Sequence, residues 1–245
     1  MIDIHNHILP GVDDGSDSLD LSRKMLEDAI EEGITDVVIT PHYMHRDIYQ
    51  IKKNELTNLF NEFKSACSDL KINLYLGNEL YIDSKLDELL EDDEVCSMND
   101  SDYVLIEFPF DDYKDIYDEY LYNVSLSRKI IIAHPERYSY VQNDVDFTKR
   151  WLDAGYYLQA NTTSLYKKEE KKVIFSLIEK GKLSFMASDA HSAYRPLSLI
   201  DAYNLIGRKF SKETAKLLMN DNPERVIQNR RIIKAVPVKK RLFSF

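Results

Sequence analysis

Short β-branched segments alternate with amphipathic helical patterns along this chain, and this alternation constrains its fold more than any other feature. Such alternation is typical of βα units, in which helices cover a parallel sheet. The strand candidates are residues 1–5, 36–40, 73–76, 103–108, 130–133, 156–160 and 183–187. The helical patterns lie at residues 19–32, 51–69, 117–128, 144–154 and 169–180. We therefore expect an α/β fold.

Residues 1–234 are expected to form a single domain, because the alternation continues through them without a break in composition. The chain has only seven glycines and seven prolines, too few for a long flexible linker. The helix at 19–32 has suitable ends, since Ser18 is a favourable N-cap and Gly33 can adopt the positive φ that often ends a helix. Residues 235–245 combine a proline with basic and aromatic residues, and we expect a flexible tail there.

The composition is that of a folded protein outside the membrane, with 44% hydrophobic and 30% charged residues. No apolar run approaches the roughly 20 residues that span a bilayer. Asp3, Asp13 and Asp14 do not fit the apolar segment of a signal peptide. Cys67 and Cys96 are the only cysteines, so a disulfide framework is excluded and a reducing environment fits best. We therefore expect a cytoplasmic protein.

The distribution of charge argues against nucleic acid as a partner. The net charge is −10, although seven basic residues and no acidic residue follow Glu224. The residues up to Glu224 therefore carry a net charge of −17. A surface of this sign repels the phosphate backbone of nucleic acids.

Side chains that bind metals follow the ends of the predicted strands, where the active sites of α/β barrels are built. His5 and His7 are two residues apart, so their imidazoles share one face of an extended chain. Asp189 and His191 repeat this spacing after the last strand. The other candidates near strand ends are His42, Glu79, Glu107 and His134. This mixture of oxygen and nitrogen ligands suits zinc, manganese or iron, and its size favours two or three ions over one.

The residues around these candidates resemble the motifs of one family. The opening motif runs His5-Asn6-His7-Ile8-Leu9-Pro10-Gly11-Val12-Asp13-Asp14-Gly15. The later motifs are Thr40-Pro41-His42, Gly77-Asn78-Glu79, Leu105-Ile106-Glu107-Phe108-Pro109, Ala133-His134-Pro135-Glu136-Arg137 and Ser188-Asp189-Ala190-His191. Over residues 1 to about 230 they resemble the PHP (polymerase and histidinol phosphatase) superfamily. More narrowly, they are similar to the PHP-type protein-tyrosine phosphatases encoded with bacterial capsule and exopolysaccharide genes.

This resemblance implies both a fold and a metal site. The fold would be a distorted (β/α)7 barrel of the PHP type, similar to a TIM barrel, with the metal site at the C-terminal rim of the strands. The resemblance favours manganese, and the ligand types also admit iron, zinc or cobalt. One ion would be held by His5, His7, Glu79 and Asp189, a second by Glu79, Glu107 and His134, and a third by Asp14, His42 and His191.

The activity that the resemblance implies is hydrolysis of phosphotyrosine. Clustered metal ions bind the phosphoryl oxygens and lower the pKa of a coordinated water to about 7, so that hydroxide attacks phosphorus. Arg137 matches a family position that binds phosphate, and Arg195 is a second candidate, one residue short of the usual position. The substrate would be the tyrosine-rich tail of a bacterial tyrosine kinase that controls capsular or exopolysaccharide synthesis.

Cysteine-dependent phosphatase chemistry is excluded, because Asn73 and Asp102, and not arginine, stand six residues after Cys67 and Cys96. Two alternatives are kept. One is a small-molecule phosphatase of the histidinol-phosphate type. The other is an interaction module that docks on the export machinery or on an anionic membrane surface through the basic and aromatic end of its tail, residues 239–245. Relatives form rings or monomers, and the sequence favours neither state.

Aromatic residues beside the metal motifs are candidates to stack on a phosphotyrosyl ring. These are Tyr43, Tyr49, Tyr138 and Tyr140. The loop at residues 43–49 would then form one lip of the site, with His45 available to protonate the leaving group.

Overall fold

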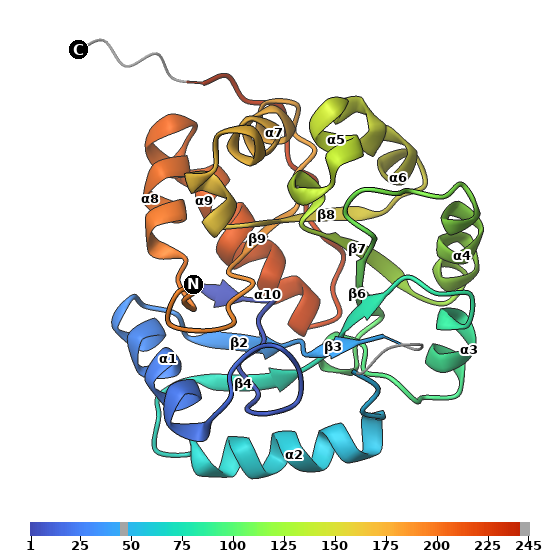
Figure 1. Ribbon diagram of the computed structural model, residues 1–245. Coiled ribbons are helices and arrows are strands. Elements are labelled where there is room, and N and C mark those ends of the chain that lie inside the picture. Colours follow the sequence, from blue (N-terminus) through green and yellow to red (C-terminus); the bar gives the residue numbers. More distant parts are fainter. Residues whose placement is uncertain (45–48, 241–245) are drawn as a thin grey trace.

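The computed structural model describes residues 1–44 and 49–240, in which parallel strands are surrounded by helices (Figure 1). His45 and the end of the tail, residues 241–245, lie outside the described residues. Every predicted strand segment overlaps a strand of the structure. The strands are β1 Ile2–Asp3, β2 Asp36–Ile39, β3 His42–Tyr43, β4 Asn73–Leu76, β5 Glu79–Tyr81, β6 Tyr103–Glu107, β7 Lys129–Ala133, β8 Tyr157–Asn161 and β9 Phe185–Ala187.

Two parallel sheets run in the orders β1-β2-β4 and β3-β5-β6-β7-β8-β9. Pro41 interrupts the strand between β2 and β3, because proline cannot donate a backbone hydrogen bond. A second interruption at Gly77 and Asn78 separates β4 from β5, so Glu79 begins a strand where we expected it to follow the end of one. The pairing of the two chain segments continues across these interruptions, because Gly77 N donates to Ile39 O at 2.8 Å and Glu79 N to Pro41 O at 3.1 Å.

The two ends of the strand series also meet. Asn6, beyond β1, forms an isolated parallel bridge with Ala190, beyond β9. Asp189 N donates to His5 O at 2.8 Å, and His7 N donates to Ala190 O at 2.7 Å. The first and the last metal-binding motifs are therefore held side by side by backbone hydrogen bonds.

Most helices surround the strands, whereas α10 lies across them in the middle of the view (Figure 1). Residue ranges 19–32, 51–69, 117–128 and 169–180 form helices with shifted ends, and 144–154 is divided into a short 3₁₀ turn and a helix. The sequence prediction missed α3, α5 and the group α8–α10. The helices are α1 Leu19–Glu31, α2 Lys53–Ala66, α3 Leu86–Glu91, α4 Ile116–Ser125, α5 Ser139–Asn143, α6 Lys149–Asp153, α7 Lys168–Glu179, α8 Ile200–Lys209, α9 Lys212–Lys216 and α10 Asn222–Ile227.

The predicted ends of α1 are confirmed. The Ser18 side chain accepts a hydrogen bond from Leu21 N, as an N-cap does. Gly33 has φ +85°, the left-handed conformation that glycine adopts without strain. Local sequence is sufficient to specify this helix.

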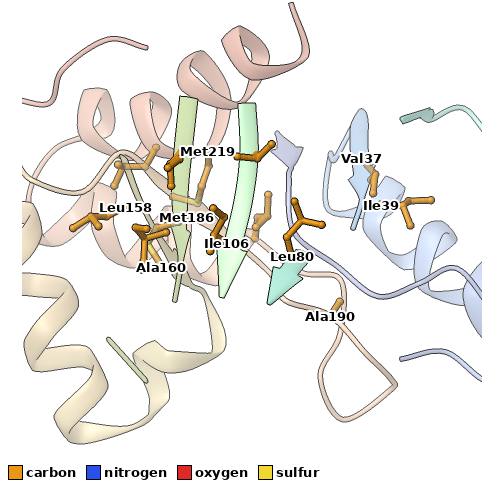
Figure 2. Close-up of a cluster of buried hydrophobic side chains, with 14 of the residues drawn as sticks. Val37, Ile39, Leu80, Ile106, Leu158, Ala160, Met186, Ala190 and Met219 are labelled. Carbon is orange, nitrogen blue, oxygen red and sulfur yellow. The ribbon is translucent and has the colours of Figure 1, made fainter. Parts of the chain in front are cut away.

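The strands carry apolar side chains on both faces. In β6, Val104 and Ile106 belong to the cluster between strands and helices, part of which Figure 2 shows, while Tyr103 and Leu105 belong to a second, smaller cluster. Side chains alternate between the faces of a strand, so Glu107 continues the face of Tyr103 and Leu105. The carboxylate of Glu107 thus emerges above a packed apolar layer at the C-terminal end of the strand.

Residues 235–240 have no regular secondary structure, yet part of this segment contacts α7. Val238 N donates to Glu179 O at 3.1 Å, and Lys240 forms an ion pair with the Glu179 carboxylate at 3.1 Å. The domain boundary at residue 234 stays a prediction. Within residues 1–44 and 49–240, none of the helices is both long and apolar enough to cross a membrane.

Candidate metal centre

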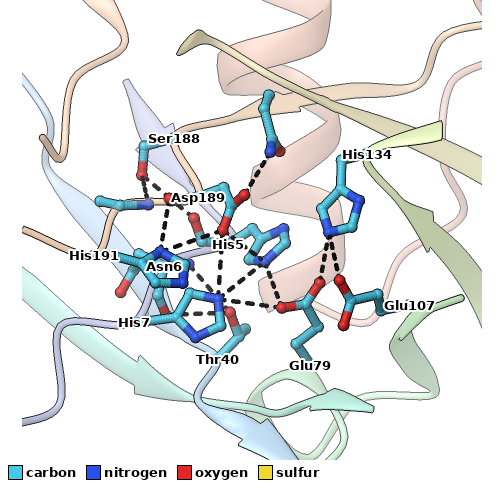
Figure 3. A network of polar contacts seen from close by, with 12 residues as sticks. His5, Asn6, His7, Thr40, Glu79, Glu107, His134, Ser188, Asp189 and His191 are labelled. Atoms are coloured by element: carbon cyan, nitrogen blue, oxygen red, sulfur yellow. Dashed lines mark hydrogen bonds and ion pairs between the residues drawn. The ribbon is translucent and has the colours of Figure 1, made fainter. Parts of the chain in front are cut away.

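All nine predicted ligand residues meet at the C-terminal ends of the strands, and Figure 3 shows most of them. Eight of them are largely inaccessible to solvent, whereas the Asp14 side chain is 51% exposed. The centre opens into a cavity of about 580 Å³. This cavity is lined by Asp14, His42, Met44, Glu79, Tyr81, Glu107, Phe108, Pro109, Phe110, Asp111, Asp112, His134, Arg137, Asp189, His191 and Arg195.

The most buried group joins the first motif to the last. Glu79 Oε2 lies 3.0 Å from His5 Nε2 and 3.1 Å from His7 Nε2. Asp189 Oδ1 lies 3.5 Å from each of the same two nitrogens. Two imidazole nitrogens and two carboxylate oxygens therefore converge on one point, which is a donor set for a divalent metal ion.

Two further groups flank the first one. On one side, His134 Nε2 lies 2.9 Å from Glu79 Oε1 and 3.4 Å from Glu107 Oε1. On the other, Asp14 Oδ1 lies 3.5 Å from His42 Nε2 and 3.6 Å from His191 Nε2. The two oxygens of Glu79 thus face different groups, as a bridging carboxylate would.

The unpaired polar atoms of the centre fit bound cations. Among the described residues, neither Glu79 Oε2 nor His42 Nδ1 has a hydrogen-bond partner, although they lie 3.2 Å apart and both are buried. Buried polar atoms are otherwise nearly always hydrogen-bonded. Burial and the nearby Glu79 carboxylate raise the pKa of the Glu107 carboxyl well above its usual range, although the Arg137 guanidinium opposes this shift. Bound cations would pair with these unpartnered atoms and would also neutralise the carboxylates.

Two of the histidines, His134 and His191, are in the protonation state that binds metal. Burial lowers the pKa of His134 to about 4 and that of His191 to about 3. Both imidazoles are therefore neutral near pH 7, which is the form that donates a lone pair to a metal.

Three histidines are oriented by acceptors on their other ring nitrogen, an arrangement common at metal sites. His5 Nδ1 lies 2.8 Å from Gln159 Oε1, and His7 Nδ1 lies 2.7 Å from Asp13 Oδ2. His191 Nδ1 lies 3.0 Å from the carbonyl oxygen of Asp189. In each case Nε2 is left to face the centre. Sequence reasoning missed Gln159 and Asp13, although Asp13 stands inside the opening motif.

Asp13 connects three parts of the centre. Besides His7, its carboxylate accepts hydrogen bonds from Gly15 N at 3.0 Å and from His42 N at 2.9 Å. Replacing Asp13 by alanine is expected to weaken metal binding about 10–100-fold, the usual cost of losing such a partner. The measurement is titration of metal-stripped protein with Mn²⁺. Asp17→Ala is the matched control, an exposed acid in the same segment, and an equal loss in both variants would contradict the assignment.

Both candidate arginines reach the centre. Arg137 Nη1 donates to Asp189 Oδ2 at 3.0 Å, and Arg195 Nη2 donates to the same oxygen. The Arg137 guanidinium also lies 4.6 Å from the centre of the Phe110 ring. Both side chains line the cavity and remain partly exposed, at 25% and 35%. They present positive charge beside the metal-binding groups, an arrangement that suits an anionic ligand.

The expectation for the tyrosines is wrong for Tyr43 and Tyr138, which are 3% and 0% exposed. Tyr138 stacks on Tyr140 within an aromatic cluster, and its oxygen accepts a hydrogen bond from Phe108 N. Tyr49 stacks on His42, with ring centres 5.8 Å apart. The aromatic residues that line the cavity are instead Tyr81, Phe108 and Phe110.

Comparisons with known proteins agree on one family. Residues 1–228 match the model of a family described as capsular polysaccharide synthesis, CpsB/CapC. The chain is 31% identical to tyrosine-protein phosphatase YwqE of Bacillus subtilis (strain 168), with 100% of both chains covered. It is 30% identical to tyrosine-protein phosphatase CpsB of Streptococcus agalactiae, covering 94% of this chain and 99% of that one.

Solved structures support the same relationship. One comes from a study of YwqE from Bacillus subtilis and CpsB from Streptococcus pneumoniae, described as unique metal-dependent tyrosine phosphatases. It superposes with a TM-score of 0.90 at 28% identity, covering 98% of this chain and 100% of that one. A phosphotriesterase homology protein from Escherichia coli is similar in fold alone, with a TM-score of 0.57 at 13% identity over 91% of this chain and 97% of that one.

Proposed function

Because this chain belongs to the CpsB/CapC family of capsular polysaccharide synthesis, we propose that it is a metal-dependent protein-tyrosine phosphatase. The observation that carries the proposal is the convergence of three donor groups and two arginines at one end of an open cavity. A phosphate monoester carries two negative charges, and this end of the cavity offers the ligands and cations to hold it.

The proposed ligands follow the three donor groups. His5, His7, Glu79 and Asp189 would hold one divalent ion, and Glu79 would bridge to a second held with Glu107 and His134. Asp14, His42 and His191 would hold the third. We propose manganese as the native metal, with iron, zinc or cobalt as substitutes, since all accept mixed oxygen and imidazole ligands.

Bound metal ions supply Lewis acidity, which neutralises phosphate charge and lowers the pKa of coordinated water towards 7. The protein's own residues position the reaction. Arg137 and Arg195 would exchange part of their contact with Asp189 for the equatorial phosphoryl oxygens, where charge accumulates during transfer. The buried base of the centre excludes water beneath the phosphate, while the open side admits the tyrosyl group.

We also propose that the two sheets form one distorted (β/α)7 barrel. The backbone pairing that continues across the two strand interruptions and the bridge between Asn6 and Ala190 support this arrangement. The fold similarity to phosphotriesterase-like enzymes points the same way. Residues 1–234 would then be one domain, with the site at its C-terminal rim as in other α/β barrels.

The substrate that we propose is phosphotyrosine in a protein, specifically a bacterial tyrosine kinase of the capsule system acting in the cytoplasm. The wide cavity favours a polypeptide, because its rim includes the exposed residues Phe110, Asp111 and Asp112. The unpaired cysteines Cys67 and Cys96 fit a reducing compartment. Burial raises the pKa of Cys96 to about 12, so this thiol is not an available nucleophile.

The substrate class is tested by comparing kcat/KM for a tyrosine-phosphorylated peptide and for histidinol phosphate, both with Mn²⁺. We expect the peptide to be preferred at least about 10-fold, a difference of roughly 1.4 kcal/mol in transition-state binding. Hydrolysis of histidinol phosphate alone would leave the metal chemistry intact and refute the protein substrate.

A further inference from the structure

Strand β8 contributes none of the nine proposed ligands, yet it presents two buried amides to the metal centre. Gln159 and Asn161 are 0% and 1% exposed, and they share one face of the strand because they are two residues apart. Amides buried among ligands need partners of their own. Their partners explain how two distant ligands are oriented together.

The two amides connect His5 to Asp189 through three consecutive hydrogen bonds. Asn161 Nδ2 donates to Asp189 Oδ2 at 2.5 Å, and Gln159 Nε2 donates to Asn161 Oδ1 at 2.9 Å. Gln159 Oε1 then lies 2.8 Å from His5 Nδ1. The backbone of β8 is also fixed at this point, because Asn161 N donates to Glu136 Oε1 at 2.8 Å.

The chemistry of the groups determines the direction of this series. An ionised carboxylate only accepts, so the NH₂ group of Asn161 must face Asp189. The Asn161 oxygen then faces Gln159 and requires its NH₂ group, which leaves the Gln159 oxygen for His5. An oxygen at this place accepts only from a protonated Nδ1. In the neutral ring, the form that binds a metal, His5 Nε2 then carries the lone pair and faces Glu79 at 3.0 Å.

We propose that Gln159 and Asn161 are positioning residues that hold His5 in the Nδ1–H form and turn Asp189 Oδ1 toward the same metal ion. The inference rests on the proposed metal site. Strand β8 carries both amides. The orientations of His5 and Asp189, which come from the two ends of the strand series, are therefore coupled. The arginines share Asp189 Oδ2 with Asn161, so the series also stabilises the carboxylate between metal and phosphate.

The test uses two variants of Gln159 in the full-length, metal-stripped protein. Gln159→Met keeps the size but removes both hydrogen bonds, whereas Gln159→Glu keeps the acceptor for His5. We expect Gln159→Met to weaken the tightest Mn²⁺ site about 10–100-fold. Gln159→Glu should recover part of this loss, because the acceptor that sets His5 is retained while the donor to Asn161 is lost. Gln142→Met, at a half-buried position of α5, is the matched control and should bind Mn²⁺ as the wild type does.

A second readout follows the proton itself, by NMR of the zinc-loaded, ¹⁵N-labelled protein. The His5 Nδ1–H signal should exchange slowly with water in the wild type and in Gln159→Glu, and rapidly in Gln159→Met. Unchanged affinity and unchanged exchange in Gln159→Met would overturn the proposal. If Gln159→Met does not fold, loss of the slow signal in Gln159→Glu would overturn it instead. Neither readout needs turnover, so a protein that binds metal without hydrolysing phosphotyrosine would refute the proposed function and leave this inference standing.

Discussion

Replacing Asp189 by asparagine is expected to lower kcat/KM for a phosphotyrosyl peptide at least about 10²–10³-fold, the cost of losing one well-placed electrostatic group. Asp189 serves both halves of the site. Its Oδ1 lies 3.5 Å from both His5 Nε2 and His7 Nε2, and its Oδ2 accepts hydrogen bonds from Arg137 and Arg195. Loss of its charge therefore weakens metal binding and at the same time removes the partner that positions both arginines.

Asparagine is the informative substitution at this position. The backbone of Asp189 has φ +52°, a conformation that asparagine adopts more readily than alanine does. Asp189→Asn thus keeps the shape of the side chain and the backbone conformation, and it removes only the negative charge. Asp153→Asn, at the exposed last residue of α6, is the matched control and should retain full activity. Activity of Asp189→Asn within about 3-fold of the wild type, at limiting Mn²⁺, would show that Asp189 is not a ligand.

Replacing Arg137 by methionine is expected to lower kcat about 10²-fold, because the guanidinium would neutralise charge that develops on the phosphoryl oxygens. The side chain is held for this task by Asp189 on one side and by the face of Phe110 on the other. Arg137→Lys should recover only part of the rate, since lysine lacks the planar fork that binds two oxygens.

The measurement for Arg137 is steady-state kinetics at saturating Mn²⁺, which separates catalysis from metal binding. Arg208→Met, in the last turn of α8 and away from the cavity lining, is the control. Equal kcat values for Arg137→Met and the wild type would show that Arg137 takes no part in the reaction. A loss that disappears as Mn²⁺ rises would instead assign it to the metal site through Asp189.

Much of the site could be predicted because most of its ligands lie at or beyond strand ends within short motifs, although His42 and Glu79 begin β3 and β5. Glu107 shows the reason, since the alternation in β6 places it on the same face as Tyr103 and Leu105. The groups that orient ligands were harder to predict. Gln159 and Asn161 are not metal-binding residue types, and only the pairing of β8 with β9 brings Asn161 beside Asp189.

The missed elements depend on contacts that local sequence does not contain. The first backbone donors of α8, Leu199 N and Ile200 N, are satisfied by the carboxylate of Glu32, which lies at the end of α1. A cap supplied from such a distance leaves no signal beside the helix. The error over Tyr138 has a similar cause, because its burial results from packing against Phe108 and Trp151.

The central claim is that phosphotyrosine hydrolysis depends on metal ions held by this centre. The most direct measurement strips the protein of metal and follows hydrolysis of a tyrosine-phosphorylated peptide as each divalent ion is returned. We predict no turnover without metal and restoration of turnover by Mn²⁺, at a stoichiometry of two or three ions per chain. Hydrolysis that survives complete removal of metal would contradict the account.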